Sequence, residues 1–177
     1  AIRWIRANSK RLGIDPNRIA AGGGSAGGHL AAAAGLIPEL DNLLEDRKVS
    51  SRPDALVLFN PAVFAPDLRP SPLSDPAAVE KRMGIPLEAI SPYSHIARGA
   101  PPTIIFHGRA DTTVPYATVE AFAKKMAEYG NRCELHGYGN ATHGFFNYGR
   151  GGNEAYTDTL QKLDAFLVSL GYLQPVG

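Results

Sequence analysis

The sequence predicts an α/β fold, a three-layer α/β/α sandwich around a mainly parallel sheet. Short apolar runs, typical of strands buried on both faces, alternate along the chain with longer stretches of helical periodicity. Alternation of this kind is typical of parallel strands joined by helices. The length of 177 residues and the apolar content of 44% fit one globular domain with a buried core.

Four segments, most of them apolar runs, predict the strands, and turn residues such as Asn60-Pro61 and His107-Gly108 end two of them. The predicted strands are residues 18–21, 55–59, 103–106 and 133–138. Cys133 begins the last run, and as the single cysteine it excludes an intramolecular disulfide and a cysteine-rich metal site. We interpret Cys133 as a core residue rather than as a nucleophile.

Helical patterns precede, separate and follow these runs. The predicted helices are residues 1–12, 26–35, 119–129 and 154–170. In the first helix we expect Ile2, Ile5 and Leu12 to lie on one face. Asn153 is expected to cap the last helix. The apolar stripe expected on that helix is Tyr156, Leu160, Leu163 and Leu167.

One serine lies among glycines where the first strand is expected to meet a helix. The stretch is AGGGSAGGHLAAAAG, residues 21–35, and Ser25 within it fits the pattern G-x-S-x-G. In that pattern a tight, strained turn lifts the serine oxygen clear of the sheet, and side chains in place of the glycines would collide with the neighbouring strand and helix. The pattern is weak alone, because it also occurs in ordinary glycine-rich turns.

Partners for the serine follow in the expected order. A serine hydroxyl needs a base to take its proton and an acid to orient that base. In a parallel fold of this kind the order along the chain is serine, acid, histidine, each in a loop after a successive strand. Asp111 follows the third strand in HGRADTTVP, and His143 follows the fourth in GNATHGFFN.

With these motifs the sequence resembles the α/β-hydrolases, in particular the carboxylesterase branch that includes hormone-sensitive-lipase-like esterases and acetyl or feruloyl carbohydrate esterases. The matching pieces are DPNRIAAGGGSAGGHLA, SPYSHIARGAPPTIIFHGRADTTVPY and ATHGFF, and the resemblance extends over nearly the whole chain. It implies that Ser25 is the nucleophile, His143 the general acid and base, and Asp111 the carboxylate that orients the histidine. It also implies one oxyanion donor, the amide of Ala26, and neither a metal nor an organic cofactor.

The resemblance further predicts what this sequence does not contain. Esterases of this branch have additional strands and an HGG-type loop upstream, whose amides complete the oxyanion hole. We therefore expect residues 1–177 to form a single, N-terminally truncated domain with a partial α/β-hydrolase fold. The strand that ends at Ser25 would become an edge of the sheet. We expect a second copy of the chain, in a homo-oligomer, or a missing N-terminal segment to pair with it.

Residues 62–102 differ from the rest of the chain. They are rich in proline and lack sustained periodicity, apart from a short helix near residues 77–83. A connection of this length is uncommon in a compact domain unless it has a function. We predict that residues 62–102 are an inserted segment that lies over the active-site face.

The expected function is that of a serine carboxylesterase, which hydrolyses short-chain, acetyl-like esters through an acyl-enzyme. With 18 Lys and Arg residues against 17 Asp and Glu residues, and no apolar run of membrane-spanning length, we expect a small-molecule ester and neither nucleic acid nor a membrane as the partner. Two alternatives stay open: a serine peptidase of the same fold, and a catalytically impaired fragment that acts as an assembly module. A metal hydrolase built on His107, Asp111 and His143 would leave Ser25 unexplained.

Overall fold

The computed structural model describes residues 1–65, 68 and 75–175. Within these ranges the chain forms a four-stranded sheet in the order β1-β2-β3-β4, with every neighbouring pair parallel. The strands are β1 (Ala20–Gly24), β2 (Ala55–Phe59), β3 (Thr103–Gly108) and β4 (Cys133–Tyr138). The parallel α/β architecture predicted from the sequence is therefore confirmed.

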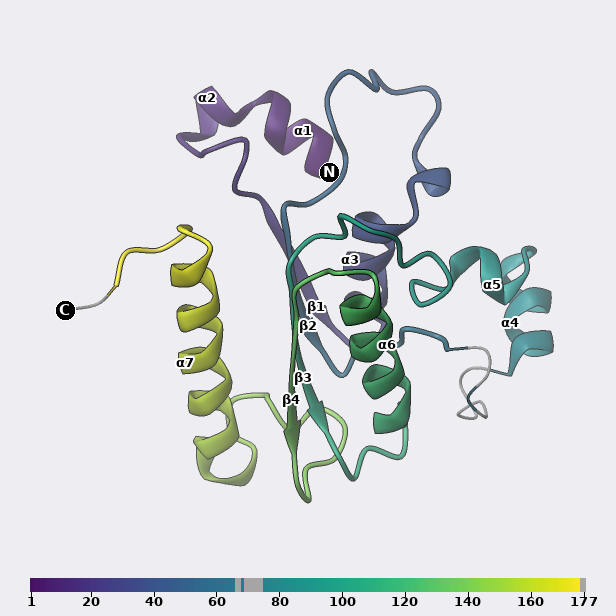
Figure 1. Cartoon of the computed structure of the whole chain (residues 1–177), viewed down its shortest axis with the longest axis vertical. Coiled ribbons are helices and arrows are strands. Elements are labelled where there is room, and N and C mark those ends of the chain that lie inside the picture. The colour runs from purple at the N-terminus through teal and green to yellow at the C-terminus, as the bar shows by residue number, and fades with distance from the viewer. Residues whose placement is uncertain (66–67, 69–74, 176–177) are drawn as a thin grey trace.

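Three long helices cover the sheet from its two sides (Figure 1). The helices α3 (Ala26–Leu36) and α6 (Tyr116–Glu128) lie on one face, and α7 (Glu154–Ser169) lies on the other. Alternate residues of a strand point to opposite faces, so Leu56 and Leu58 pack in the core toward α3 and α6. Val57 packs in the second core, toward α7. These layers are the predicted α/β/α sandwich.

Short helices complete the described part of the chain. They are α1 (Ile2–Ala7), α2 (Ser9–Leu12), α4 (Pro76–Met83) and α5 (Leu87–Ile90), with single turns of 3-10 helix at Pro38–Leu40 and Gly151–Asn153. The helix α4 confirms the one expected within residues 62–102. That the segment lies over the active-site face stays a prediction, since residues 66–67 and 69–74 of it are outside the described residues.

The first helix differs from its prediction. It is interrupted at Asn8, and Leu12, expected on the buried face, is 41% exposed. The buried residue of α1 is Arg3, which forms ion pairs with Asp41 and Glu45. Charge pairing with a distant loop, rather than an apolar stripe, therefore holds this helix against the domain.

Three further details differ from the predictions: a strand boundary, a helix cap and a residue of an apolar stripe. The first strand begins at Ala20 rather than at residue 18 and continues through the glycines, because Gly22 pairs with Val57 in the ladder to β2. Asn153 makes no side-chain cap on α7, since its Oδ1 accepts a hydrogen bond from the Gly149 amide instead. Leu160 of the predicted stripe is 40% exposed, while Phe166 is the large apolar residue that α7 buries.

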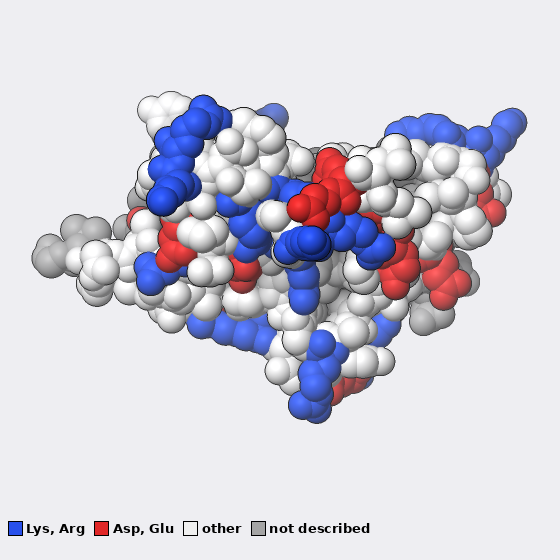
Figure 2. Space-filling model, turned by 90° about the horizontal axis from the view of Figure 1, so that it is seen from above, with Lys and Arg blue, Asp and Glu red and all other residues white. Residues whose placement is uncertain are grey.

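The face at the amino ends of the strands has charges of both signs (Figure 2). Basic and acidic side chains lie beside one another on this face, in keeping with ion pairs such as Arg6 with Asp54 at 3.1 Å. Among the described residues, no helix is long and apolar enough to cross a membrane.

Candidate active site

The carboxyl ends of the strands bring the predicted site residues to one end of the sheet. The register places Gly24 beside Phe59 and Phe59 beside Phe106, so β1 and β2 end at the same level and β3 continues two residues further. Ser25 follows β1 directly, while Asp111 and His143 lie in the loops after β3 and β4. In parallel sheets this is the end at which ligands bind.

Ser25 lies at a strained turn between β1 and α3. Its backbone has φ 54° and ψ −115°, in the positive-φ region that non-glycine residues rarely adopt. Its amide donates a hydrogen bond to the Phe59 carbonyl at 2.8 Å, and its carbonyl accepts one from His29 at 3.0 Å. The surrounding backbone thus holds the strained turn in place, as a nucleophile elbow requires.

Close backbone contacts explain two of the glycines around Ser25. A Cβ at Gly23 would lie 2.6 Å from the backbone carbon of Gly27, and a Cβ at Gly28 would lie 2.9 Å from the Pro61 Cβ. Gly27 itself has open space where a Cβ would be, so the expectation that every glycine of the pattern avoids a collision of its own is wrong there. The tight approach of strand and helix therefore depends mainly on Gly23 and Gly28.

Asp111 and His143 are joined by a hydrogen bond. The distance from Asp111 Oδ2 to His143 Nδ1 is 2.7 Å, the Asp111 side chain is fully buried, and the His143 side chain is 28% exposed. A carboxylate at Nδ1 fixes the ring orientation and leaves Nε2 as the nitrogen that can accept a proton. The pair has the geometry of an oriented general base with one side open.

Three further donors satisfy the Asp111 carboxylate. The Thr113 and Val114 amides donate to Oδ1 at 2.8 and 2.9 Å, and Asn60 Nδ2 donates to Oδ2 at 2.8 Å. Because a buried carboxylate is costly without partners, this set is what allows Asp111 to lie beneath His143. Asn60 was not among the residues singled out from the sequence, where Asn60-Pro61 indicated only the end of a strand.

His107 lies beneath the same carboxylate. It is fully buried, its Nε2 is 2.8 Å from the Val114 carbonyl oxygen, and the same nitrogen is 3.5 Å from Asp111 Oδ2. Burial lowers the pKa of His107, which favours a neutral ring that donates from Nε2. His107 therefore supports the loop that carries Asp111 and is too deep to meet a substrate.

Ala26 and Phe146 border the serine turn. Ala26 is exposed as the first residue of α3, where amides have no acceptor within the helix and can meet an anion. Phe145 is buried in the core, and Phe146 lies against Phe59 with ring centroids 4.7 Å apart. Phe146 is also the side chain that a Cβ at Gly24 would meet, at 2.8 Å. The loop that carries His143 thus packs beside the serine turn.

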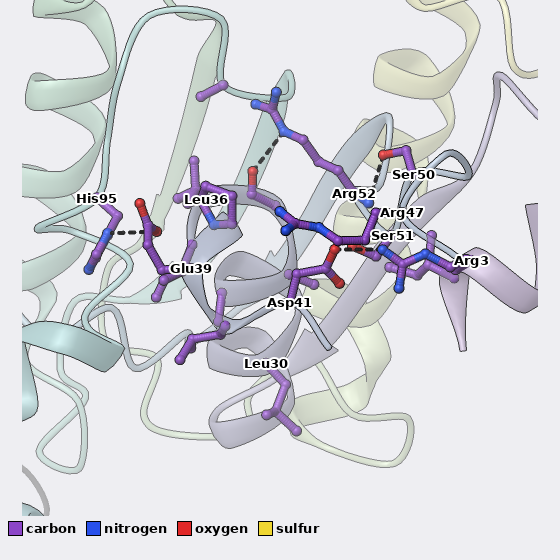
Figure 3. Close-up of a pocket in the computed structure, with 18 of the residues that line it drawn as sticks. Arg3, Leu30, Leu36, Glu39, Asp41, Arg47, Ser50, Ser51, Arg52 and His95 are labelled. Carbon is purple, nitrogen blue, oxygen red and sulfur yellow. Dashed lines mark hydrogen bonds and ion pairs between the residues drawn. The ribbon is translucent and has the colours of Figure 1, made fainter. Parts of the chain in front are cut away.

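A hollow of about 870 Å³ lies at the other end of the domain. It is bordered by the end of α3, the start of α1 and the loops around Asp41, Arg52 and His95 (Figure 3). The side chains that line it are already paired in several places, for instance Arg52 with the Gly35 carbonyl at 2.9 Å. Ser25, Asp111 and His143 do not line it, so the hollow is separate from the candidate site. Among the described residues, no cluster of three or more His, Cys, Asp or Glu side chains could hold a metal ion.

The fold and the arrangement of the candidate site are those of the α/β-hydrolase class, and comparison with known proteins agrees. A model of the alpha/beta hydrolase fold family matches residues 1–147. The chain belongs to the alpha/beta hydrolase family.

The similar proteins are esterases. Esterase LipQ of Mycobacterium tuberculosis (strain ATCC 25618 / H37Rv) is 32% identical over 142 residues, which cover 73% of this chain and 33% of LipQ. Esterase LipC of the same strain is 29% identical over 137 residues, which cover 71% of this chain and 34% of LipC.

The structural comparison gives the same class. A solved structure of Thermogutta terrifontis esterase 2 phosphonylated by sarin has a TM-score of 0.92 and 47% identity, covering 99% of this chain and 65% of that one. The propionate-bound form of the same esterase has a TM-score of 0.90 and 49% identity, covering 99% and 64%. The chain thus spans about a third of the curated relatives and less than two thirds of the solved esterase.

Proposed function

We propose that the chain carries the nucleophile, base and acid of a serine carboxylesterase that hydrolyses short-chain esters. The observation that carries the proposal is the 2.7 Å hydrogen bond between the buried Asp111 and the partly exposed His143, in a loop that packs beside the strained turn at Ser25. A serine at such a turn is a weak nucleophile until a base of this kind accepts its proton.

The reaction follows from these positions. His143 Nε2 takes the proton of the Ser25 hydroxyl as Oγ attacks the ester carbonyl, and the Ala26 amide donates to the resulting oxyanion. The tetrahedral intermediate collapses, the alcohol leaves with the proton from His143, and an acyl-serine forms. Water then attacks the acyl-serine with His143 again as the base, which releases the carboxylic acid and restores Ser25.

Support for a short acyl group comes from the solved esterase. The structures of Thermogutta terrifontis esterase 2 include propionate-bound and butyrate-bound forms, at 49% and 48% identity to this chain. We assign the same class of acyl group to this protein. A peptidase of the same fold would instead turn over aminoacyl amides, so amide substrates belong in the same assay.

The working site also needs a second oxyanion donor. Removal of one such donor costs on the order of 3 kcal/mol of transition-state stabilisation, or a hundredfold or more in rate. We assign that donor to polypeptide equivalent to the third of the esterase structures that this chain does not match. The same polypeptide would pair with the free edge of β1.

The test is hydrolysis of p-nitrophenyl acetate by the purified protein, beside Ser25→Ala and with a fluorophosphonate probe that reacts with activated serines. We expect turnover and labelling that are both lost in Ser25→Ala, a fall of at least a thousandfold in kcat/KM. Ser9→Ala is the matched control, since Ser9 lies in α2, at the amino ends of the strands and thus at the opposite end of the sheet from Ser25.

Labelling that persists in Ser25→Ala, or a folded protein that neither turns over esters nor takes the probe, would contradict the proposal. In the second case the assembly-module alternative would take its place. Faster cleavage of aminoacyl p-nitroanilides than of acetyl esters would favour the peptidase.

A further inference from the structure

Asn60 connects the strand ends at the candidate site. It follows β2 directly, is fully buried and has φ 43°, in the left-handed region that asparagine tolerates better than most residues. Its backbone amide donates a hydrogen bond to the Phe106 carbonyl of β3 at 2.9 Å. The backbone is thus tied into the sheet, and the side chain is free to reach across the site.

The Asn60 side chain makes two hydrogen bonds of opposite sense. Nδ2 donates to Asp111 Oδ2 at 2.8 Å, and Oδ1 accepts from the Gly144 amide at 3.3 Å. A flipped amide would set oxygen against the carboxylate and NH₂ against the Gly144 N–H, so the network fixes its orientation. One side chain therefore holds both the carboxylate and the residue next to His143.

Asp111 Oδ2 is shared by Asn60 and His143. This oxygen accepts from Asn60 at 2.8 Å and lies 2.7 Å from His143 Nδ1, while the backbone amides of the Asp111 loop hold the other oxygen. The backbone amides hold Asp111 Oδ1 in place, and Asn60 holds Oδ2, the oxygen that contacts His143. Ser25 is connected to the same end of β2, since its amide donates a hydrogen bond to the carbonyl of Phe59, the residue before Asn60.

We propose that Asn60 is a positioning residue, whose amide aligns Asp111 Oδ2 with His143 and sets the position of the His143 loop relative to Ser25. The inference rests on the proposed function, because alignment of the pair matters for catalysis only if Ser25 is the nucleophile. Asn60 touches neither the ester nor the proton that is transferred, so it acts through Asp111 and Gly144.

Two variants separate the amide from the backbone. Asn60→Gly keeps a residue that accepts positive φ and removes both side-chain hydrogen bonds. Asn60→Asp keeps the shape and puts a carboxyl in place of the amide. Asn131→Ala is the matched control, because Asn131 also bridges two loop segments, with bonds of 2.8 Å from Gly99 and 2.9 Å to Ala97, at the other end of the sheet.

We expect Asn60→Gly to lower kcat about tenfold to hundredfold with little change in KM, as for other supporting residues that orient a reacting group. In Asn60→Asp, the protonated carboxyl donates to Asp111 as the amide does. Its loss of a proton at alkaline pH leaves two carboxylates in contact, which is unfavourable. We expect the wild type to reach a plateau of kcat/KM at alkaline pH, and in Asn60→Asp this plateau should become a fall of about tenfold or more. Asn131→Ala should change neither kcat nor the shape of the pH profile.

A second readout does not depend on turnover. The proton between His143 Nδ1 and Asp111 should give a low-field NMR resonance that is lost or shifted in Asn60→Gly and kept in Asn131→Ala. If the wild type shows this resonance but no Ser25-dependent turnover, the proposed function fails while the role of Asn60 is still decided by the resonance. The proposal is overturned if Asn60→Gly keeps the wild-type resonance together with more than half of kcat, or if Asn60→Asp scales the whole pH profile by one factor.

Discussion

The two edges of the sheet have different chemistry. On β4, Glu134 pairs with Arg132 at 2.6 Å and lies near His136, while the Tyr138 hydroxyl donates to Asp158 on α7 at 2.6 Å. On β1, the sequence is Ala-Ala-Gly-Gly-Gly, and the strand is partly exposed along its length. Charged side chains are a common device that prevents an edge strand from pairing with another chain. In the described sheet, charged side chains therefore protect the β4 edge, whereas the β1 edge has only the small, uncharged residues that are typical of an interior strand.

The backbone of β1 leads to the same conclusion. Ser25 N donates to β2, and alternate residues of a strand direct their backbone groups to opposite sides. Ala20, Gly22 and Gly24 therefore direct their N–H and C=O groups away from β2, where the described sheet has no further strand. Since Ser25, the proposed nucleophile, follows this strand, the unprotected edge and the candidate site are parts of one feature.

The largest effect is expected from a substitution in α7, the helix that packs on the sheet beside the protected edge. Phe166 is 2% exposed on α7, packs in the core beneath the sheet and lies under the Arg132 guanidinium at 5.0 Å. Phe166→Ala should lower the free energy of unfolding by about 3–5 kcal/mol, because it removes a large buried ring and leaves a cavity. The control Leu160→Ala, on an exposed position of the same helix, should change it by less than about 1 kcal/mol. Urea titration followed by circular dichroism measures both, and equal losses would contradict the assigned core.

An intermediate effect is expected at the unprotected edge. The purified chain should self-associate in sedimentation velocity, because bare strand edges pair with one another. Ala20→Lys places a charge on the exposed start of β1 and should weaken association about tenfold or more, whereas Ala77→Lys, on the exposed face of α4, adds the same charge without that effect. Glu134→Val removes protection from β4 and should strengthen association.

A chain that stays monomeric at every concentration, or one that responds equally to the two lysines, would show that β1 is not an adhesive edge. Addition of the polypeptide proposed to pair with β1 should compete with self-association and raise esterase turnover. If the polypeptide competes with self-association but does not raise turnover, it pairs with β1 without supplying the second oxyanion donor.

The sequence predicted the features that depend on neighbouring residues and on the order of motifs along the chain. The strands β2 and β4 have the predicted bounds, because turn residues follow both, Asn60-Pro61 after β2 and Gly139-Asn140 after β4. The candidates Asp111 and His143 followed from chain order and from the resemblance, and the structure brings them within hydrogen-bonding distance. Their roles in catalysis stay predictions.

Contacts between distant residues were not predictable in the same way. Nothing in the sequence distinguished Arg3 from its neighbours in the first helix, and only its ion pairs with Asp41 and Glu45, about 40 residues away, explain its burial. Asn60 looked like part of a turn signal, since its partner Asp111 lies 51 residues further along the chain. A single sequence contains periodicity and turn chemistry, but which side chains meet across the ends of strands is decided by the register of the sheet.

The smallest expected effect concerns pH and again separates the two edges. Burial, and next the positive charge of Lys162, lower the pKa of His136 on β4, while Glu134 and Asp158 oppose that shift. The unfolded chain takes up a proton below about pH 6.5, where the folded His136 stays neutral, so stability falls as the pH decreases from about 6.5 toward the lowered folded value. Burial also lowers the pKa of His29 and His107, which adds to the same slope. His136→Gln should make the loss of urea midpoint between pH 7 and pH 5 shallower and leave the midpoint at pH 8 nearly unchanged. If the urea midpoint of His136→Gln fell with pH as steeply as that of the wild type, the stability of the protected edge would not depend on a neutral His136. The strand β1 has no titratable side chain and should contribute nothing to this pH dependence.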